Sequence, residues 1–217
     1  TYKGRTDSMM LILVNPKTKK TTMISMRRDA RVTIPGYEST FPQKINAAYA
    51  YGSTATAIKT VESYLNIPID FYALVNMSGL EKMVTQVGGI SVKSPIDFTY
   101  SQETAHAYGA NLYRFHKGST GYEHSDDNGV TWSATKHVLT CDAALAFSRM
   151  RYDEPDGDDG RQKRQRFVLA GLFKKSANVS SLLNTKFMNT MSSNVQTDLS
   201  FGDITTIASK YINAAKN

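Results

Sequence analysis

The residues best suited to chemistry are concentrated between positions 145 and 166, where the sequence reads LAFSRMRYDEPDGDDGRQKRQR. An apolar run leads here to two arginines, then to a carboxylate-rich loop, then to further arginines. Such a charge run is commonly a solvated helix surface. Arginine outnumbers lysine in it, however, and the rigid planar guanidinium suits bidentate binding of phosphate or carboxylate. The composition therefore favours a preorganised anion site over a solvated surface.

The spacing within this stretch sets a geometric condition on such a site. Arg149 and Arg151 are two positions apart, and on one continuous helix that spacing turns them roughly 200° away from each other. They can face one ligand only if the helix ends near Met150. Arg161 and Gln165 are four apart and share a helix face, so both could reach one anion near the start of their helix.

Asp158, just ahead of that second helix, has two readings. The simpler one is an N-terminal cap. The other is a carboxylate that orients an arginine or accepts a proton. Further charged residues stand near the predicted ends of elements, where α/β proteins place ligands: Arg5 with Asp7, Arg28 with Asp29, and Lys44. Each pair alone could be a structural ion pair, but their joint placement favours one shared site.

The elements that must position these residues follow from periodicity. Two β-compatible runs, 9–14 and 21–26, are joined by an Asn-Pro turn and predict a hairpin. The first run is apolar throughout, which suggests a strand covered on both faces. Helical spacing is expected at 44–51, 53–65, 77–87, 139–150, 161–175, 181–191 and 201–215, and strands at 71–75 and 90–92. The strand–helix–strand order predicts an α/β protein, with a mixed sheet flanked by helices on both faces (α/β/α).

Residues 97–136 lose all periodicity, so we expect an irregular insertion within a single domain that spans 1–217. The four histidines lack the spacing of zinc ligands. Trp132 could stack on a sugar or anchor the loop in a small core. Apolar residues of the helices at 57–65, 80–87 and 167–172 could line a groove or simply fill a core.

Composition bounds the partners. With 41% hydrophobic and 21% charged residues in 217, the chain is typical of a globular protein. A formal net charge of +7 makes an acidic partner plausible: nucleic acid, an anionic membrane surface or a phosphorylated substrate. Nucleic acid is disfavoured, because the arginines alternate with carboxylates and no helix-turn-helix pattern is present. The single cysteine, Cys141, permits no internal disulfide and is expected to be buried. No apolar run is long enough for a membrane span, and we expect any anchor to precede Thr1 in a longer protein.

Several motifs, taken in order, resemble those of the LytR-CpsA-Psr family. They are GRTDSMM at 4–10, NPK at 15–17, SMRRD at 25–29, KINAAY at 44–49, GGISV at 88–92, ALAFSRMRYD at 144–153 and GDDGRQKRQ at 157–165. The resemblance implies an α/β/α enzyme held outside the cytoplasmic membrane of a Gram-positive bacterium by an N-terminal helix absent from this sequence. It also implies transfer of a glycan phosphate from a polyprenyl-pyrophosphate carrier to peptidoglycan, in the attachment of teichoic acid or capsule.

Carried over position by position, the resemblance places seven residues around the pyrophosphate: Arg5, Arg28, Lys44, Arg149, Arg151, Arg161 and Gln165. Asp7 would bind Mg²⁺, and Asp158 would orient an arginine or act as the base. The family also has a strand upstream of the Arg5 motif that ends in a second aspartate, and this sequence starts after it. Arg27, Ala30 and Cys141 depart from the usual residues without altering the expected phosphate contacts. The alternative is a module of the cell envelope that binds polyprenyl-linked glycan without turnover.

Overall fold

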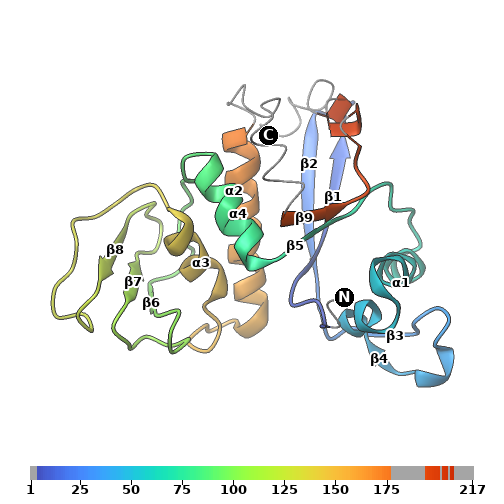
Figure 1. Ribbon diagram of the computed structural model, residues 1–217, viewed down its shortest axis with the longest axis horizontal. Helices are drawn as coiled ribbons and strands as arrows, with labels where there is room; N and C mark the ends of the chain where they lie inside the picture. The colour runs from blue at the N-terminus through green and yellow to red at the C-terminus, as the bar shows by residue number, and fades with distance from the viewer. Residues whose placement is uncertain (1–3, 177–193, 201, 205, 208–217) are drawn as a thin grey trace.

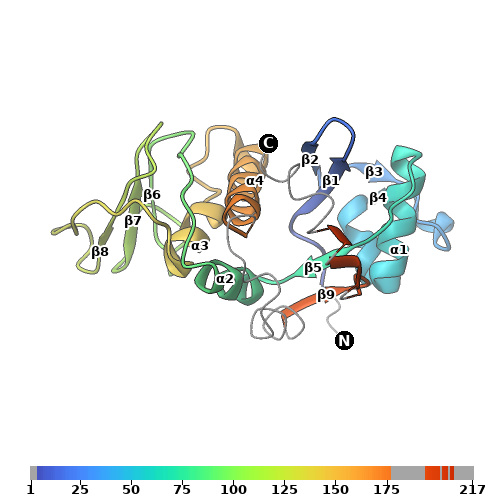
Figure 2. The same cartoon turned by 90° about the horizontal axis from the view of Figure 1, so that it is seen from above.

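The computed structural model describes residues 4–176, 194–200, 202–204 and 206–207. The described elements gather into two lobes, seen on the right and left of Figure 1. We call residues 4–65 the N-terminal lobe and residues 77–176 the second lobe. Helix α4 (Gly157–Ser176) of the second lobe packs against α3 and against strand β2 of the N-terminal lobe, and Figure 2 shows it lying between them.

The N-terminal lobe begins with the expected hairpin. Strands β1 (Met9–Asn15) and β2 (Lys20–Met26) pair antiparallel over their full length. The Asn15 side chain holds the turn by accepting hydrogen bonds from the backbone N–H groups of Lys17 and Thr18, at 3.0 and 3.1 Å. The hairpin prediction is confirmed, but coverage of both faces is not. Ile12 and Val14 are 37% and 40% exposed.

The rest of this lobe encloses a small core. Strands β3 (Arg31–Val32) and β4 (Gln43–Lys44) pair antiparallel, with the 3-10 turns η1 (Glu38–Thr40) and η2 (Ile45–Ala47) beside them. Helix α1 (Ala48–Leu65) follows and is kinked at Gly52 and Ser53, where the sequence predicted one helix to stop and another to start. Its buried Val61 packs with a cluster that comprises Met26, Val32, Ile34, Ile45, Ala47 and Ala48.

The second lobe has a larger core around α3 (Cys141–Arg149). Residues Ala143 to Ser148 of α3 are all buried, and α2 (Met77–Gln86) and α4 pack on either side of it. The predicted groove residues at 80–87 and 167–172 are among those that fill or flank this core. Cys141 is half-buried rather than buried, because it opens α3.

Two sequence predictions about strands are wrong. Strand β5 (Ala73–Val75) pairs antiparallel with β9 (Val195–Thr197), and 90–92 forms only a single bridge from Ile90 to Leu139, so no parallel unit forms there. The region 97–136 is not irregular throughout. It contains a three-stranded antiparallel sheet of β6 (Phe98–Tyr100), β7 (Leu112–Phe115) and β8 (Tyr122–Ser125).

This sheet packs by one row of aromatic side chains. Phe98, Phe115 and Tyr122 lie opposite one another in register and are buried. The ring of Phe115 meets that of Phe147 on α3 at 5.3 Å between centroids. Strands of three or four residues are too short for periodicity to reveal. Trp132 anchors the adjacent loop, because its Nε1 donates to the Gly129 carbonyl oxygen and a guanidinium covers its ring.

The α/β class is confirmed, although the described strands form four small antiparallel sheets rather than one mixed sheet. No helix within the described ranges is long and apolar enough to cross a membrane. The predicted helix at 181–191 lies outside the described residues. Of the one predicted at 201–215, residues 202–204 and 206–207 are described and are helical.

Candidate functional site

The end of α3 meets the condition that the sequence placed on it. The helix ends at Arg149, and Met150 turns the chain into an extended conformation with φ −52° and ψ 132°. Arg151 therefore leaves the helix axis and lines a cavity between the lobes. Arg149 stays on the last turn of α3, exposed, and is not among the lining residues.

A buried arginine fixes this helix end. The Arg164 side chain is 0% exposed, and its Nε donates to the Phe147 carbonyl oxygen at 2.9 Å. Its terminal nitrogens contact the Met150 carbonyl oxygen and the carboxylate of Glu154. Carbonyl groups in the last turn of a helix lack partners within the helix, and Arg164 supplies them. Burial lowers the pKa of Arg164 to about 10, so it remains a cation at neutral pH. Nothing in the sequence distinguishes this arginine from its neighbours.

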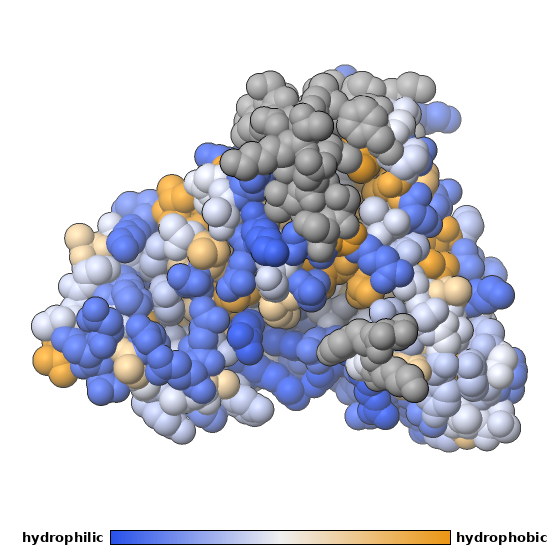
Figure 3. Space-filling view, in the orientation of Figure 1, coloured by the Kyte–Doolittle hydropathy of each residue, from blue (hydrophilic) through white to orange (hydrophobic). Residues whose placement is uncertain are grey.

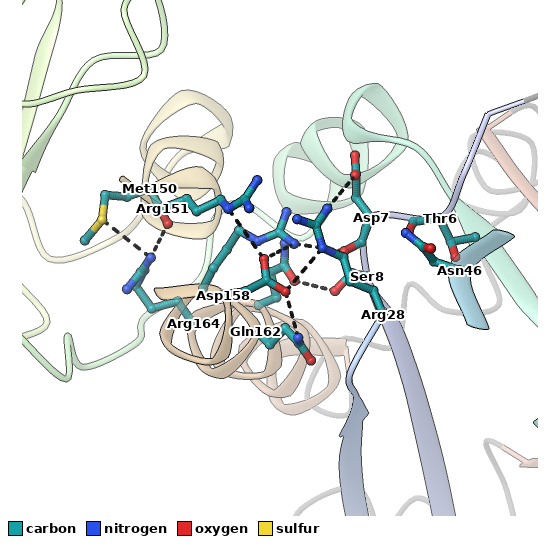
Figure 4. A network of polar contacts seen from close by, with 12 residues as sticks. Thr6, Asp7, Ser8, Arg28, Asn46, Met150, Arg151, Asp158, Gln162 and Arg164 are labelled. Carbon is teal, nitrogen blue, oxygen red and sulfur yellow. Dashed lines mark hydrogen bonds and ion pairs between the residues drawn. The ribbon is translucent and has the colours of Figure 1, made fainter. Parts of the chain in front are cut away.

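Asp158 is the centre of the site. It lies in the first turn of α4, inside the helix rather than ahead of it, because α4 begins at Gly157. Its carboxylate accepts from Arg161 at 2.7 Å and from Gln162 at 3.0 Å. Arg28 Nε and Arg151 Nε lie 3.5 and 3.7 Å from the same carboxylate. Figure 4 shows Arg28 of the N-terminal lobe and Arg151 and Gln162 of the second lobe converging on Asp158.

The ionisation of Asp158 follows from these contacts. Burial is the largest single influence and acts to raise its pKa. The hydrogen bond from Gln162 and the charges of Arg161 and Arg28 together outweigh burial and lower the pKa below the ordinary value of 3.8. Asp158 is therefore ionised at neutral pH, and a carboxylate of lowered pKa is a weak base. The geometry favours the orienting role over the proton-accepting role.

Residues 5–8 join the two lobes at this point. Asp7 Oδ1 lies 3.4 Å from Arg28, and the Asp7 backbone carbonyl oxygen accepts from Arg161 at 2.9 Å. Ser8 hydrogen-bonds Gln165. These contacts place Arg161 and Gln165 against the segment beside the cavity, although neither is among the residues that line it.

The cavity has a volume of about 390 Å³, within the usual range for small-ligand sites. Its lining is almost wholly charged: Arg5, Asp7, Arg27, Arg28, Asp29, Lys44, Asn46, Arg151, Asp158, Asp159 and Gln162. Figure 3 shows hydrophilic residues across the lower junction of the lobes. Five cations face four carboxylates, so the lining carries a small positive excess. The cavity also includes three residues that the sequence had not predicted, each one or two positions from a predicted residue: Asn46, Asp159 and Gln162.

Two buried polar atoms at the site lack hydrogen-bond partners within the described part of the chain. They are Asn46 Oδ1, an acceptor, and Arg161 Nε, a donor. Buried polar groups are nearly always paired, so each calls for an explanation. Among the described residues no group of three or more His, Cys, Asp or Glu side chains is arranged to hold a metal ion. A cation here would need ligands supplied by a substrate as well as by Asp7.

Comparison with known proteins assigns the chain to a family. The LytR_cpsA_psr family model matches residues 1–217. The polyisoprenyl-teichoic acid–peptidoglycan teichoic acid transferase TagU of Enterococcus faecalis is 39% identical over 212 residues, which are 97% of this chain and 60% of that protein.

Solved structures agree. A Streptococcus agalactiae protein has a TM-score of 0.77 at 35% identity, covering 99% of this chain and 68% of that one. TagT bound to LIIa-WTA has a TM-score of 0.70 at 28% identity, with 96% and 69% covered. The chain spans about half to three fifths of the length of its first curated relatives, 47% and 60% for two of them. Motifs, fold and comparisons together show that this chain belongs to the LytR-CpsA-Psr family.

Proposed function

We propose that this chain forms the catalytic part of a transferase that moves a glycan phosphate from a polyprenyl-pyrophosphate carrier to peptidoglycan. The observation that carries the proposal is the convergence of Arg28, Arg151 and Arg161 on one carboxylate beside a charged cavity. The relatives named teichoic acid transferases and the structure of TagT bound to LIIa-WTA support the substrate class.

The arginines would act on the charge that builds up during transfer. An acceptor hydroxyl oxygen attacks the phosphorus that carries the glycan, and the bond from that phosphorus to the polyprenyl phosphate oxygen breaks. The leaving polyprenyl phosphate takes the electron pair, and the hydroxyl proton passes to solvent. Preorganised cations stabilise the negative charge on the leaving phosphate. Asp158 orients Arg28 and Arg151. Because it lies 3.5 and 3.7 Å from their Nε atoms, both guanidinium groups can still bind a phosphate.

Magnesium is part of this proposal, with Asp7 as the protein ligand. Mg²⁺ in phosphate sites commonly takes one or two carboxylates together with substrate oxygens and water. The site fits that description, because the Asp7 side chain is 68% exposed and lines the charged cavity. Bound there, the ion would neutralise phosphate charge. A rise in melting temperature with Mg²⁺ and substrate analogue, lost in Asp7→Ala, would report this binding without any turnover.

The apolar carrier has a candidate path along the hairpin. Ser25 of β2 contacts Arg166 of α4, and on that same hairpin face lie the exposed side chains of Ile12 and Val14. Figure 3 shows hydrophobic residues above the polar junction, toward the hairpin.

We place the enzyme at the extracytoplasmic face of the membrane, held by an N-terminal helix, because the acceptor is peptidoglycan.

The test is release of polyprenyl phosphate by the full-length protein from a lipid-linked donor, with acceptor glycan and Mg²⁺. We expect Arg28→Ala and Arg151→Ala each to lower the rate about 10²- to 10³-fold. Arg31→Ala removes an exposed arginine outside the cavity and serves as the matched control. Donor binding without release in the wild type would establish the alternative, a glycan-binding module that does not turn over.

A further inference from the structure

Three aromatic rings stack beside the arginine cavity. The His106 ring lies 5.5 Å from that of Tyr108, with the two planes 3° apart, and 5.0 Å from that of Tyr152, with the planes 25° apart. Tyr108 and Tyr152 are each 65% exposed. Large exposed aromatic side chains that are held in a fixed arrangement are more typical of binding surfaces than of a solvated loop.

Hydrogen bonds hold the loop that carries two of these rings in place. Ser101 is 0% exposed, and its backbone N–H donates to the His106 carbonyl oxygen at 2.8 Å. Its own carbonyl oxygen accepts from Ala105 at 2.9 Å. Thr104 hydrogen-bonds the Tyr108 carbonyl oxygen. The rings of His106 and Tyr108 therefore lie on a turn that is fixed by hydrogen bonds.

The third ring connects this loop to the cavity. Tyr152 directly follows Arg151, and the Arg151 guanidinium carbon lies 5.9 Å from the centre of the Tyr152 ring. Arg151 itself lines the cavity. On the other side, Asp153 lies 3.9 Å from His106 Nδ1. The same turn after α3 thus delivers a cation to the cavity and an aromatic ring to the stack.

We propose that Tyr108, His106 and Tyr152 form a stacking surface for a hexopyranose ring of the glycan, next to the phosphate held at the arginines. Aromatic ring faces carry partial negative charge, which attracts the polarised C–H groups on one face of a sugar ring. The nearby carboxylate of Asp153 can accept hydrogen bonds from sugar hydroxyls, and the imidazole nitrogens can donate to them or accept from them. A sugar one phosphate away from Arg151 would reach the Tyr152 ring.

This inference rests on the proposed function for the identity of the ligand, but it is tested by binding alone. Two probes distinguish the sources of the sugar ring. A soluble tetrasaccharide of peptidoglycan represents the acceptor, and farnesyl-pyrophosphoryl N-acetylglucosamine represents the donor. Titration calorimetry is run on the wild type, Tyr108→Ala, Tyr152→Ala and Tyr152→Phe. Tyr64→Ala removes an exposed tyrosine of α1 (51% exposed) as the matched control.

We expect each alanine variant at Tyr108 and Tyr152 to weaken binding of one of the probes by about 2- to 10-fold. Tyr152→Phe, which keeps the ring, and Tyr64→Ala should both bind like the wild type. Binding of inorganic pyrophosphate should be unchanged in all of them, which shows that the arginine cavity is intact. Loss of donor binding assigns the ring to the donor, and loss of tetrasaccharide binding assigns it to the acceptor.

Unchanged binding of both probes in Tyr108→Ala and Tyr152→Ala would overturn the stacking surface, whether or not the protein transfers glycan. Conversely, weakened binding in a protein that releases no polyprenyl phosphate would support the stacking surface while the transferase function fails.

Discussion

One arginine of α4, Arg164, is buried inside the second lobe, whereas other arginines surround Asp158 beside the cavity. Arg164 and Glu154 form an ion pair inside the second lobe, with side chains 0% and 3% exposed. Three residues earlier, Arg161 joins Arg28 and Arg151 around Asp158, where the last two are 23% and 43% exposed. The Arg164 side chain is directed at the backbone of α3, whereas Arg28 and Arg151 line the cavity. The same charge run thus supplies both a structural clamp and a site.

The buried and the cavity arginines have different roles. Arg164 donates hydrogen bonds to the carbonyl oxygens at the end of α3, and the position of that helix end determines where Arg151 points. Arg161 is hydrogen-bonded to Asp158 at 2.7 Å, whereas Arg28 and Arg151 lie 3.5 and 3.7 Å from that carboxylate and line the cavity. We therefore expect loss of Arg164 to affect stability first, and loss of Arg28 or Arg151 to affect binding first.

The largest expected change in the free energy of unfolding is at the buried ion pair of Arg164 and Glu154. Arg164→Ala should lower the free energy of unfolding by about 3–5 kcal/mol, because it leaves a buried carboxylate without its partner. Lys163→Ala, an exposed neighbour on the same helix, should change it by about 0.5 kcal/mol or less. Urea unfolding followed by circular dichroism measures both.

The double substitution Arg164→Met with Glu154→Leu sharpens this test. Replacing a whole buried ion pair by apolar residues is often neutral or stabilising, so the double variant should be more stable than Arg164→Ala. If Arg164→Ala unfolds like the wild type, the arginine does not clamp α3.

A smaller effect on stability is expected at Gly160, whose backbone lies against the Glu154 side chain. A Cβ built on Gly160 would lie 2.1 Å from the Glu154 carboxyl carbon, so no side chain fits there without displacing the carboxylate. Gly160→Ala should cost about 1–3 kcal/mol of stability through overpacking. Gly36→Ala adds a Cβ that meets nothing within 4 Å, although its φ of 84° adds backbone strain. A Gly160→Ala variant as stable as the wild type would show that the Glu154 contact does not exclude a side chain.

The smallest expected effect concerns the pH dependence of Asp158. Its pKa in the folded protein is lowered from the ordinary 3.8, so the ionised carboxylate stabilises the fold. That contribution is complete above the unfolded-state pKa and is lost as the pH falls through the folded-state value. The stability difference between wild type and Asp158→Asn should therefore be constant at neutral pH and shrink in acid. A difference that grows as the pH falls would contradict the lowered pKa.

The sequence predicted much of the site because its signals are local. The break at Met150 and the four-residue spacing of Arg161 and Gln165 are properties of single helices. The sequence could not separate Arg164 from Arg161, since burial depends on how α4 packs on α3. Short strands such as Phe98–Tyr100 were missed because their stability comes from aromatic packing on Phe147 rather than from their own pattern.

The most direct test of pyrophosphate binding at these arginines is the affinity of the full-length protein for farnesyl pyrophosphate, measured by titration calorimetry. Arg28→Ala and Arg151→Ala should each weaken this binding about tenfold or more, as expected for loss of a charge-assisted hydrogen bond, while Arg31→Ala should bind like the wild type. Equal affinity in all four proteins would contradict the claim that the arginines around Asp158 bind the pyrophosphate.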